Sequence, residues 1–118
     1  MAPREELPSA AGTVADEHPE VWDAFATLGA AVSAAGPLDD RTKRLVKVAL
    51  AMGAGTVGGT HSHVRRALAE GVTAEELNHI ALLAVPTLGW PHAVAALTWV
   101  RDVTGERGGG KPGGPSEG

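Results

Sequence analysis

The sequence contains no cysteine. Disulfides, thiolate metal ligands and catalytic thiols are excluded, because each of them requires a cysteine sulfur. A basic excess is also missing, since the formal net charge is −4, and this argues against a nucleic-acid partner. No apolar run approaches the roughly 20 residues of a membrane-spanning helix, so no membrane partner is expected. The charged segment at residues 1–7 is unlike a secretory signal, and a cytoplasmic protein is expected.

Aromatic side chains are scarce, at 3% of the sequence, whereas apolar residues as a whole reach 43%. The apolar residues are mostly Ala, Val and Leu. Small side chains let helices approach closely, but they bury less apolar surface than large ones. A chain of 118 residues with such a core would gain stability from a subunit interface. We therefore expect a homo-oligomer.

Helical spacing of apolar residues predicts five helices, at about residues 19–34, 39–54, 57–70, 73–85 and 91–103. Asp39 is a suitable N-cap for the second helix, and Thr73 with Glu76 forms a capping box for the fourth. Pro86 ends or kinks that helix near Val85. No alternating strand pattern competes, so the predicted class is all-α. The apolar stripes predict burial of Leu45, Val48, Ala49 and Met52, then of Leu77, Ile80, Ala81, Ala84 and Leu88, and finally of Val94, Leu97 and Trp99 or Val100.

The ends of the chain differ in composition from the middle. Residues 1–17 lack sustained periodicity, and residues 105–118 are rich in Gly and Pro. We therefore predict a flexible N-terminal segment at 1–17, one helical domain at 18–104 and a disordered tail at 105–118.

The five histidines are the natural candidates for acid–base or metal chemistry. His63 lies on a helix with small neighbours, Gly59 and Ala67, which leave room for a pocket beside the imidazole. His61 shares an apolar stripe with Val57, and a core or interface histidine bonded to a backbone carbonyl is the simpler interpretation. Two residues on one helix point about 200° apart, so His61 and His63 cannot jointly bind a metal. A metal site with His61 would need ligands from another helix or subunit. The sequence leaves open which of the two histidines faces a pocket.

Other candidates come from the second and last helices. Basic residues crowd the second helix, among them Arg44, and either form a solvated face or supply one cation that holds a carboxylate. His92 lies in the first turn of the last helix, where the helix dipole disfavours a charged imidazole. A neutral His92 is therefore a candidate hydrogen-bond donor.

Several segments together resemble the carboxymuconolactone decarboxylase family, which includes the alkylhydroperoxidase D-like proteins. They are Gly-Pro-Leu-Asp-x-Arg-Thr-Lys at 36–43, His-Ser-His-Val-Arg-Arg-Ala-Leu-Ala-Glu-Gly at 61–71, Thr-Ala-Glu-Glu-Leu at 73–77 and Gly-Trp-Pro-His-Ala at 89–93. The resemblance covers roughly residues 19–104. It implies an all-α bundle that assembles as a homotrimer or homohexamer, with pockets near subunit interfaces.

The peroxidase branch of this family carries Cys-x-x-Cys-x-x-x-His with a Glu upstream. On this sequence the His corresponds to His63, the two cysteines to Thr56 and Gly59, and the Glu to a position near Arg44. Thiol-dependent peroxide reduction is excluded, because it requires a thiolate.

The decarboxylase branch opens a lactone acid with loss of carbon dioxide and does not need the cysteines. The resemblance therefore implies a pocket for a small organic acid at a subunit interface, with acid–base catalysis by His63 and no cofactor. Arg44, Arg65 or Arg66 would pair with the carboxylate, and Thr56 and His92 are further candidates for substrate binding. Two alternatives stay open: a non-catalytic binding or accessory protein that keeps the fold, and a metal site across subunits that uses His61 or His63.

Overall fold

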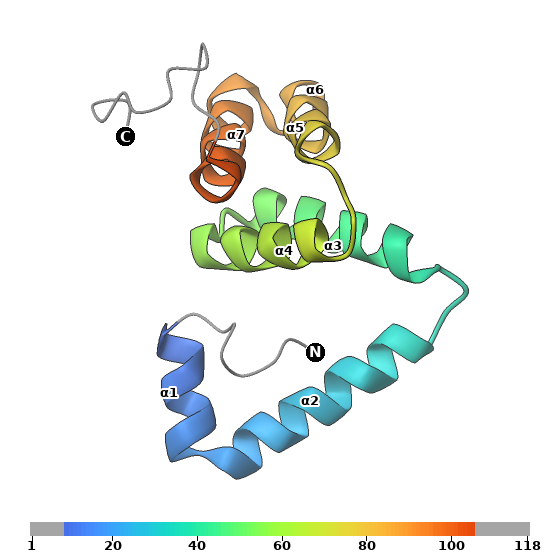
Figure 1. Ribbon diagram of the computed structural model, residues 1–118, viewed down its shortest axis with the longest axis vertical. Coiled ribbons are helices and arrows are strands. Elements are labelled where there is room, and N and C mark those ends of the chain that lie inside the picture. The colour runs from blue at the N-terminus through green and yellow to red at the C-terminus, as the bar shows by residue number, and fades with distance from the viewer. Residues whose placement is uncertain (1–8, 106–118) are drawn as a thin grey trace. The chain divides into compact units, whose positions relative to one another are not determined.

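Figure 1 shows the computed structural model of the chain, which describes residues 9–105. The described part is helical and contains no strand, so the predicted all-α class is confirmed. The five predicted helices correspond to α2, α3, α4, α5 and α7. The helices are α1 (Ser9–Glu17), α2 (Pro19–Ala34), α3 (Asp40–Ala54), α4 (Val57–Ala69), α5 (Ala74–Leu83), α6 (Val85–Leu88) and α7 (Trp90–Thr104).

The chain divides into two compact units, and the first of them ends at Lys43 in the first turn of α3. Within this unit α1 packs against α2 and buries Ala15. No residue of α2 is buried. Its large apolar side chains, Val21, Phe25, Leu28 and Val32, are each more than half exposed.

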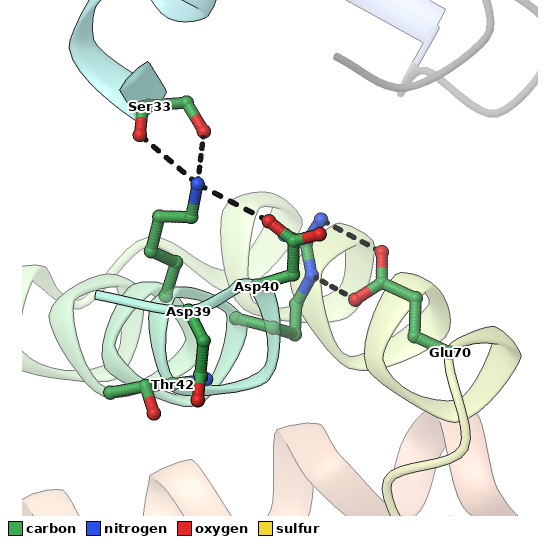
Figure 2. Close-up of polar contacts among 7 residues, drawn as sticks. Ser33, Asp39, Asp40, Thr42 and Glu70 are labelled. Carbon is green, nitrogen blue, oxygen red and sulfur yellow. Dashed lines mark hydrogen bonds and ion pairs between the residues drawn. The ribbon is translucent and has the colours of Figure 1, made fainter. Parts of the chain in front are cut away.

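The start of α3 confirms the predicted N-cap. The backbone N–H of Thr42 donates a hydrogen bond of 2.7 Å to Asp39 Oδ1, and both residues are drawn in Figure 2. This bond lowers the pKa of the Asp39 carboxyl. One turn further, Lys43 Nζ donates to the carbonyl oxygen and the hydroxyl of Ser33, at 3.0 and 2.7 Å. It also lies 3.3 Å from Asp40 Oδ1, so Lys43 has polar contacts with residues on both sides of the turn within this unit.

The second unit begins at Arg44 and contains the core of the protein. In Figure 1 the helices α3 and α4 overlap in the view, and α5, α6 and α7 are drawn above them. Helix α7 packs against both α4 and α5. The buried cluster takes residues from α3, α4, α5, α7 and the turn before α5. Its members are Val48, Met52, Val64, Ala67, Val72, Leu77, Ala81, Ala96 and Val100.

Both sequence signals at the ends of α5 are confirmed. Glu76 N–H donates to Thr73 Oγ1 at 3.1 Å, while Thr73 N–H donates to Glu76 Oε1 at 2.9 Å, which completes the capping box. At its other end α5 stops at Leu83, two residues before Val85. Pro86 then lies in the four-residue helix α6, where a missing N–H costs no hydrogen bond.

Several predictions about the helices were wrong. Residues 9–17, predicted to be flexible, form α1 in the structure, because this segment packs on α2 although it lacks strong periodicity. Val94 and Leu88 are 44% and 43% exposed rather than buried. Ala49 is exposed as well. On α7 the side turned to the core carries Ala93, Ala96 and Val100, so small residues decide its orientation.

Two further predictions concern the ends of the chain and the membrane. Gly105 has φ of +81° and closes the C-terminus of α7 in a left-handed conformation. The rest of the predicted tail, 106–118, and residues 1–8 lie outside the described part. Among the described helices none combines the length and the apolar character that a bilayer crossing requires.

Candidate functional site

One face of α4 carries most of the residues that the sequence singled out. Thr56, Gly59, His63, Arg66 and Glu70 follow one another at intervals of three or four residues, and such residues share one side of a helix. The N-cap Thr56 begins this stripe, and the C-cap Glu70 ends it. The stripe is therefore a polar face with a histidine at its middle.

Helix α3 supplies the partner of this face through Arg44. The guanidinium forms two contacts with Glu70, from Nε to Oε1 at 3.0 Å and from Nη2 to Oε2 at 3.1 Å, and Figure 2 draws both at the labelled Glu70. The third nitrogen, Nη1, lies 2.8 Å from Nδ1 of His63. Arg44 thus joins two residues of α4, and its side chain is only 13% exposed.

The contact with Arg44 determines the tautomer of His63. A guanidinium has only donors, so Nδ1 must accept this hydrogen bond, and the proton of the neutral ring lies on Nε2. Burial, together with the charges of Arg66, Arg44 and Lys47, lowers the pKa of His63 to about 4, while Glu70 acts in the opposite direction. At neutral pH the ring is therefore an uncharged donor at Nε2 and has no free lone pair at Nδ1.

Cations surround this neutral ring. Lys47 lies one turn after Arg44 on α3, and Arg66 lies one turn after His63 on α4. Arg66 Nη2 donates a hydrogen bond of 2.7 Å to Oγ of the buried Ser62. The charges of Arg66, Arg44 and Lys47 all act on His63, and a site with several charges of one sign attracts a ligand of the opposite sign.

The other candidates for substrate binding are placed differently. Arg65 is exposed and lies two residues from His63, so it points to another side of α4. Thr56 Oγ1 donates to the carbonyl of Ala51 at 3.1 Å. A Cβ on Gly59 would lie 2.7 Å from Thr56 Oγ1, which shows how closely Thr56 and Gly59 approach each other.

His61 faces away from this cluster. Its Nε2 donates to Asp102 Oδ2 of α7 at 3.0 Å, so the predicted backbone partner was wrong. Of the two histidines, His63 is the one that joins the polar cluster. Within residues 9–105 no group of three or more His, Cys, Asp or Glu side chains is arranged to hold a metal ion. A metal site shared between subunits stays a prediction.

His92 is bonded inside the fold. Its Nε2 donates to the carbonyl oxygen of Met52 at 2.6 Å, and its ring meets Trp99 edge-on at a centroid distance of 6.2 Å. The donor that the sequence suggested for a substrate thus links α7 to α3 instead. Contact with a substrate would have to use Nδ1, and this role stays a prediction.

A separate apolar groove of about 820 Å³ lies along α3, α5 and α6. Its lining includes Leu50, Ile80, Leu83 and Leu88, with Glu76 and His79 among the few polar residues. None of the groove residues belongs to the polar face of α4. The groove and the His63 cluster are therefore two distinct features.

Glu70 is the site residue that the sequence analysis missed. It lies seven residues after His63 and hence on the same side of α4. Sequence spacing alone could have placed these two residues together. It could not show that Arg44, from a different helix, reaches both of them.

The comparisons with known proteins agree with this fold. No match was found among curated proteins or among solved structures. In a comparison with protein families, residues 19–102 match the carboxymuconolactone decarboxylase family. The match runs from the start of α2 almost to the end of α7 and contains the whole polar cluster. With an all-α fold and no cysteine in its sequence, the chain belongs to the carboxymuconolactone decarboxylase family.

Proposed function

We propose that this protein binds a small organic acid beside His63 and promotes decarboxylation of a lactone-type acid. The observation that carries the proposal is the 2.8 Å contact between Arg44 Nη1 and His63 Nδ1. It leaves a neutral imidazole with its proton on Nε2, in a partly buried position next to several cations. Family membership adds support, because it makes the chain a relative of carboxymuconolactone decarboxylases.

The substrate carboxylates would be held by the cations that surround His63. Lys47, Arg66 and Arg44 are the candidates, since the charges of all three act on the ring. Arg44 is matched by Glu70, so a ligand at Arg44 would have to compete with a carboxylate of the protein. Arg65 would contribute to the field at longer range.

In the proposed reaction the bond between the ring carbon and the departing carboxylate breaks, and carbon dioxide leaves. The electron pair moves into the conjugated lactone and places negative charge on its carbonyl oxygen. A hydrogen bond from His63 Nε2–H would stabilise this oxygen, as a preorganised donor does in an oxyanion hole. The resulting enolate then takes a proton on carbon from water. A histidinium acid is unsuitable here, because the pKa of His63 lies at about 4.

Turnover tests the proposal directly. We expect purified protein to convert 4-carboxymuconolactone, or a related lactone or keto acid, and His63→Gln to lower kcat by about 100-fold or more, in the range found when one such donor is removed. His18→Gln is the matched control, since the His18 side chain makes no capping bond and is exposed. The rate should be flat between pH 8 and pH 6 and should fall only as the pH approaches 4.

Equal turnover by wild type and His63→Gln would remove His63 from the mechanism. Absence of turnover by the wild type over the whole panel would refute catalysis. In that case binding of the same acids, detected as a thermal shift that His63→Gln abolishes, would favour the non-catalytic binding protein. If the wild type shows no turnover and also binds none of these acids, the proposed site is contradicted.

We also propose that the protein self-associates, as a homotrimer or homohexamer, through apolar surface on α3, α5 and α6. Leu50, Leu82 and Leu83 are each more than half exposed in the single chain. Exposed apolar surface of this kind is costly in water and marks interaction sites. Family membership supports the proposal as well.

A further inference from the structure

Three side chains form a continuous chain of contacts that starts and ends on α4. Glu70 holds the guanidinium of Arg44 by two contacts of 3.0 and 3.1 Å, and Arg44 reaches back to Nδ1 of His63 at 2.8 Å. The carboxylate of Glu70 and the imidazole of His63 are thus bonded to one and the same guanidinium. Through this guanidinium Glu70 can act on the ring by position as well as by charge.

The planarity of the guanidinium makes this arrangement directional. Pairing of Nε and Nη2 with the two carboxylate oxygens fixes the plane of the group and its rotation about Cδ–Nε. Nη1 then has a fixed direction, and this direction leads to Nδ1 of His63. Without the carboxylate, a long arginine side chain would have several rotamers, and only some of them would place a donor at Nδ1.

From this geometry we propose that Glu70 is a positioning residue, which acts through Arg44 to hold His63 as the Nε2–H tautomer. The inference builds on the proposed function, for which an Nε2–H donor is required. It also defines the substrate class. A ring locked in this way suits substrates that develop negative charge on an oxygen, and it is unsuited to removing a proton from carbon.

A purely electrostatic role of Glu70 predicts something different. The carboxylate raises the pKa of His63, against the larger effects of burial and of Arg66. If only this charge mattered, its loss would lower the pKa of the ring and leave the tautomer unchanged. If Glu70 positions Arg44, its loss would instead release Nδ1 and let the Nδ1–H tautomer appear. The tautomer therefore separates the two roles, whereas activity alone would not.

The experiment is NMR of the ¹⁵N-labelled full chain at pH 7, with long-range ¹H–¹⁵N correlations of the imidazoles. We expect His63 of the wild type to show the Nε2–H tautomer alone. In Glu70→Gln the side chain carries no charge and has one amide oxygen, so it cannot accept hydrogen bonds on two oxygens from the Arg44 guanidinium. For this variant we expect a measurable population of His63 with the proton on Nδ1. Arg44→Lys should give the same result, because an ammonium cannot pair in two places and also reach Nδ1. Glu75→Gln, at an exposed carboxylate on α5, is the matched control and should leave the spectrum unchanged.

Retention of a pure Nε2–H signal in both Glu70→Gln and Arg44→Lys would overturn the inference. Far-UV circular dichroism shows whether the variants keep their helices, and Glu70, at 47% exposed, is expected to tolerate the change. Turnover of the lactone panel is measured in parallel. A tautomer change in a wild type without turnover or acid binding would support Glu70 as a positioning residue and refute the proposed function. Turnover by the wild type, with an unchanged tautomer in both variants, would support the proposed function and refute Glu70 as a positioning residue.

Discussion

At the scale of single residues, the imidazole of His63 makes stability depend on pH. Its pKa is about 4 in the folded protein and near the ordinary value of 6.5 in the unfolded chain. Between these values the unfolded chain binds more protons, so acid favours unfolding. We expect the free energy of unfolding to decrease as the pH falls from 7 towards 4, by on the order of 1–3 kcal/mol from this residue.

Urea denaturation of wild type and His63→Gln at pH 7, 6, 5 and 4.5 measures this contribution. The difference between the two proteins should shrink steadily towards acid pH, because Gln has no proton to gain. His18→Gln controls for loss of an exposed histidine. Parallel pH profiles for wild type and His63→Gln would contradict a depressed pKa.

A residue-scale comparison also explains what the sequence could predict of the site. The helical period predicts that His63 lies beside Gly59. The same period also places Glu70, seven residues after His63, on this face of α4. The contacts of Arg44 with Glu70 and His63 could not be predicted, because a basic residue on a helix is usually solvated. Only the packing of α3 near α4 decides that this side chain reaches His63. The partner of His92 could not be predicted for the same reason, since Met52 is remote in sequence.

At the scale of elements, the first turn of α4 depends on a close contact between Thr56 and Gly59. A Cβ added at Gly59 would lie 2.7 Å from Thr56 Oγ1 and 3.3 Å from Thr56 Cβ. We expect Gly59→Ala to destabilise the protein by about 1 kcal/mol, since the strain exceeds the gain in helix propensity that Ala brings. In a Thr56→Ala background the same substitution should be neutral or stabilising, because the nearest atom is gone.

A double-mutant cycle with thermal unfolding measures this coupling. Gly58→Ala is the matched control, since a Cβ at Gly58 meets no atom within 4 Å, and there Ala should stabilise α4 in both backgrounds. Equal effects of Gly59→Ala with and without the Thr56 side chain would show that the contact does not limit this position.

Element boundaries were predicted best where local chemistry decides them. Asp39, Thr73 and Pro86 mark helix ends by their own hydrogen bonds or by a missing N–H, and the structure places all three as expected. Helix α1 was missed, because its stability comes from packing on α2 rather than from its own pattern. The burial of α7 was misjudged at Val94, since Ala93 and Ala96 allow a closer approach of the neighbouring helices.

At the scale of the whole molecule, the single chain leaves much apolar surface in water. The groove along α3, α5 and α6 is lined mainly by apolar side chains, and Leu50 and Leu83 on its walls are 66% and 57% exposed. A core built largely of Ala and Val offers limited compensation. We therefore expect the wild type to sediment as a homotrimer or homohexamer in analytical ultracentrifugation.

Charge placed on the groove should weaken this assembly. In the variant Leu50→Glu with Leu83→Glu, two carboxylates would be buried at the proposed interface without partners, and this costs several kcal/mol per subunit. We expect the variant to sediment as a smaller species with unchanged helix content, and Thr98→Glu, on the exposed side of α7, to sediment like wild type. A wild type that is monomeric at all concentrations would refute self-association. An oligomer that survives both glutamates would place the interface on another surface.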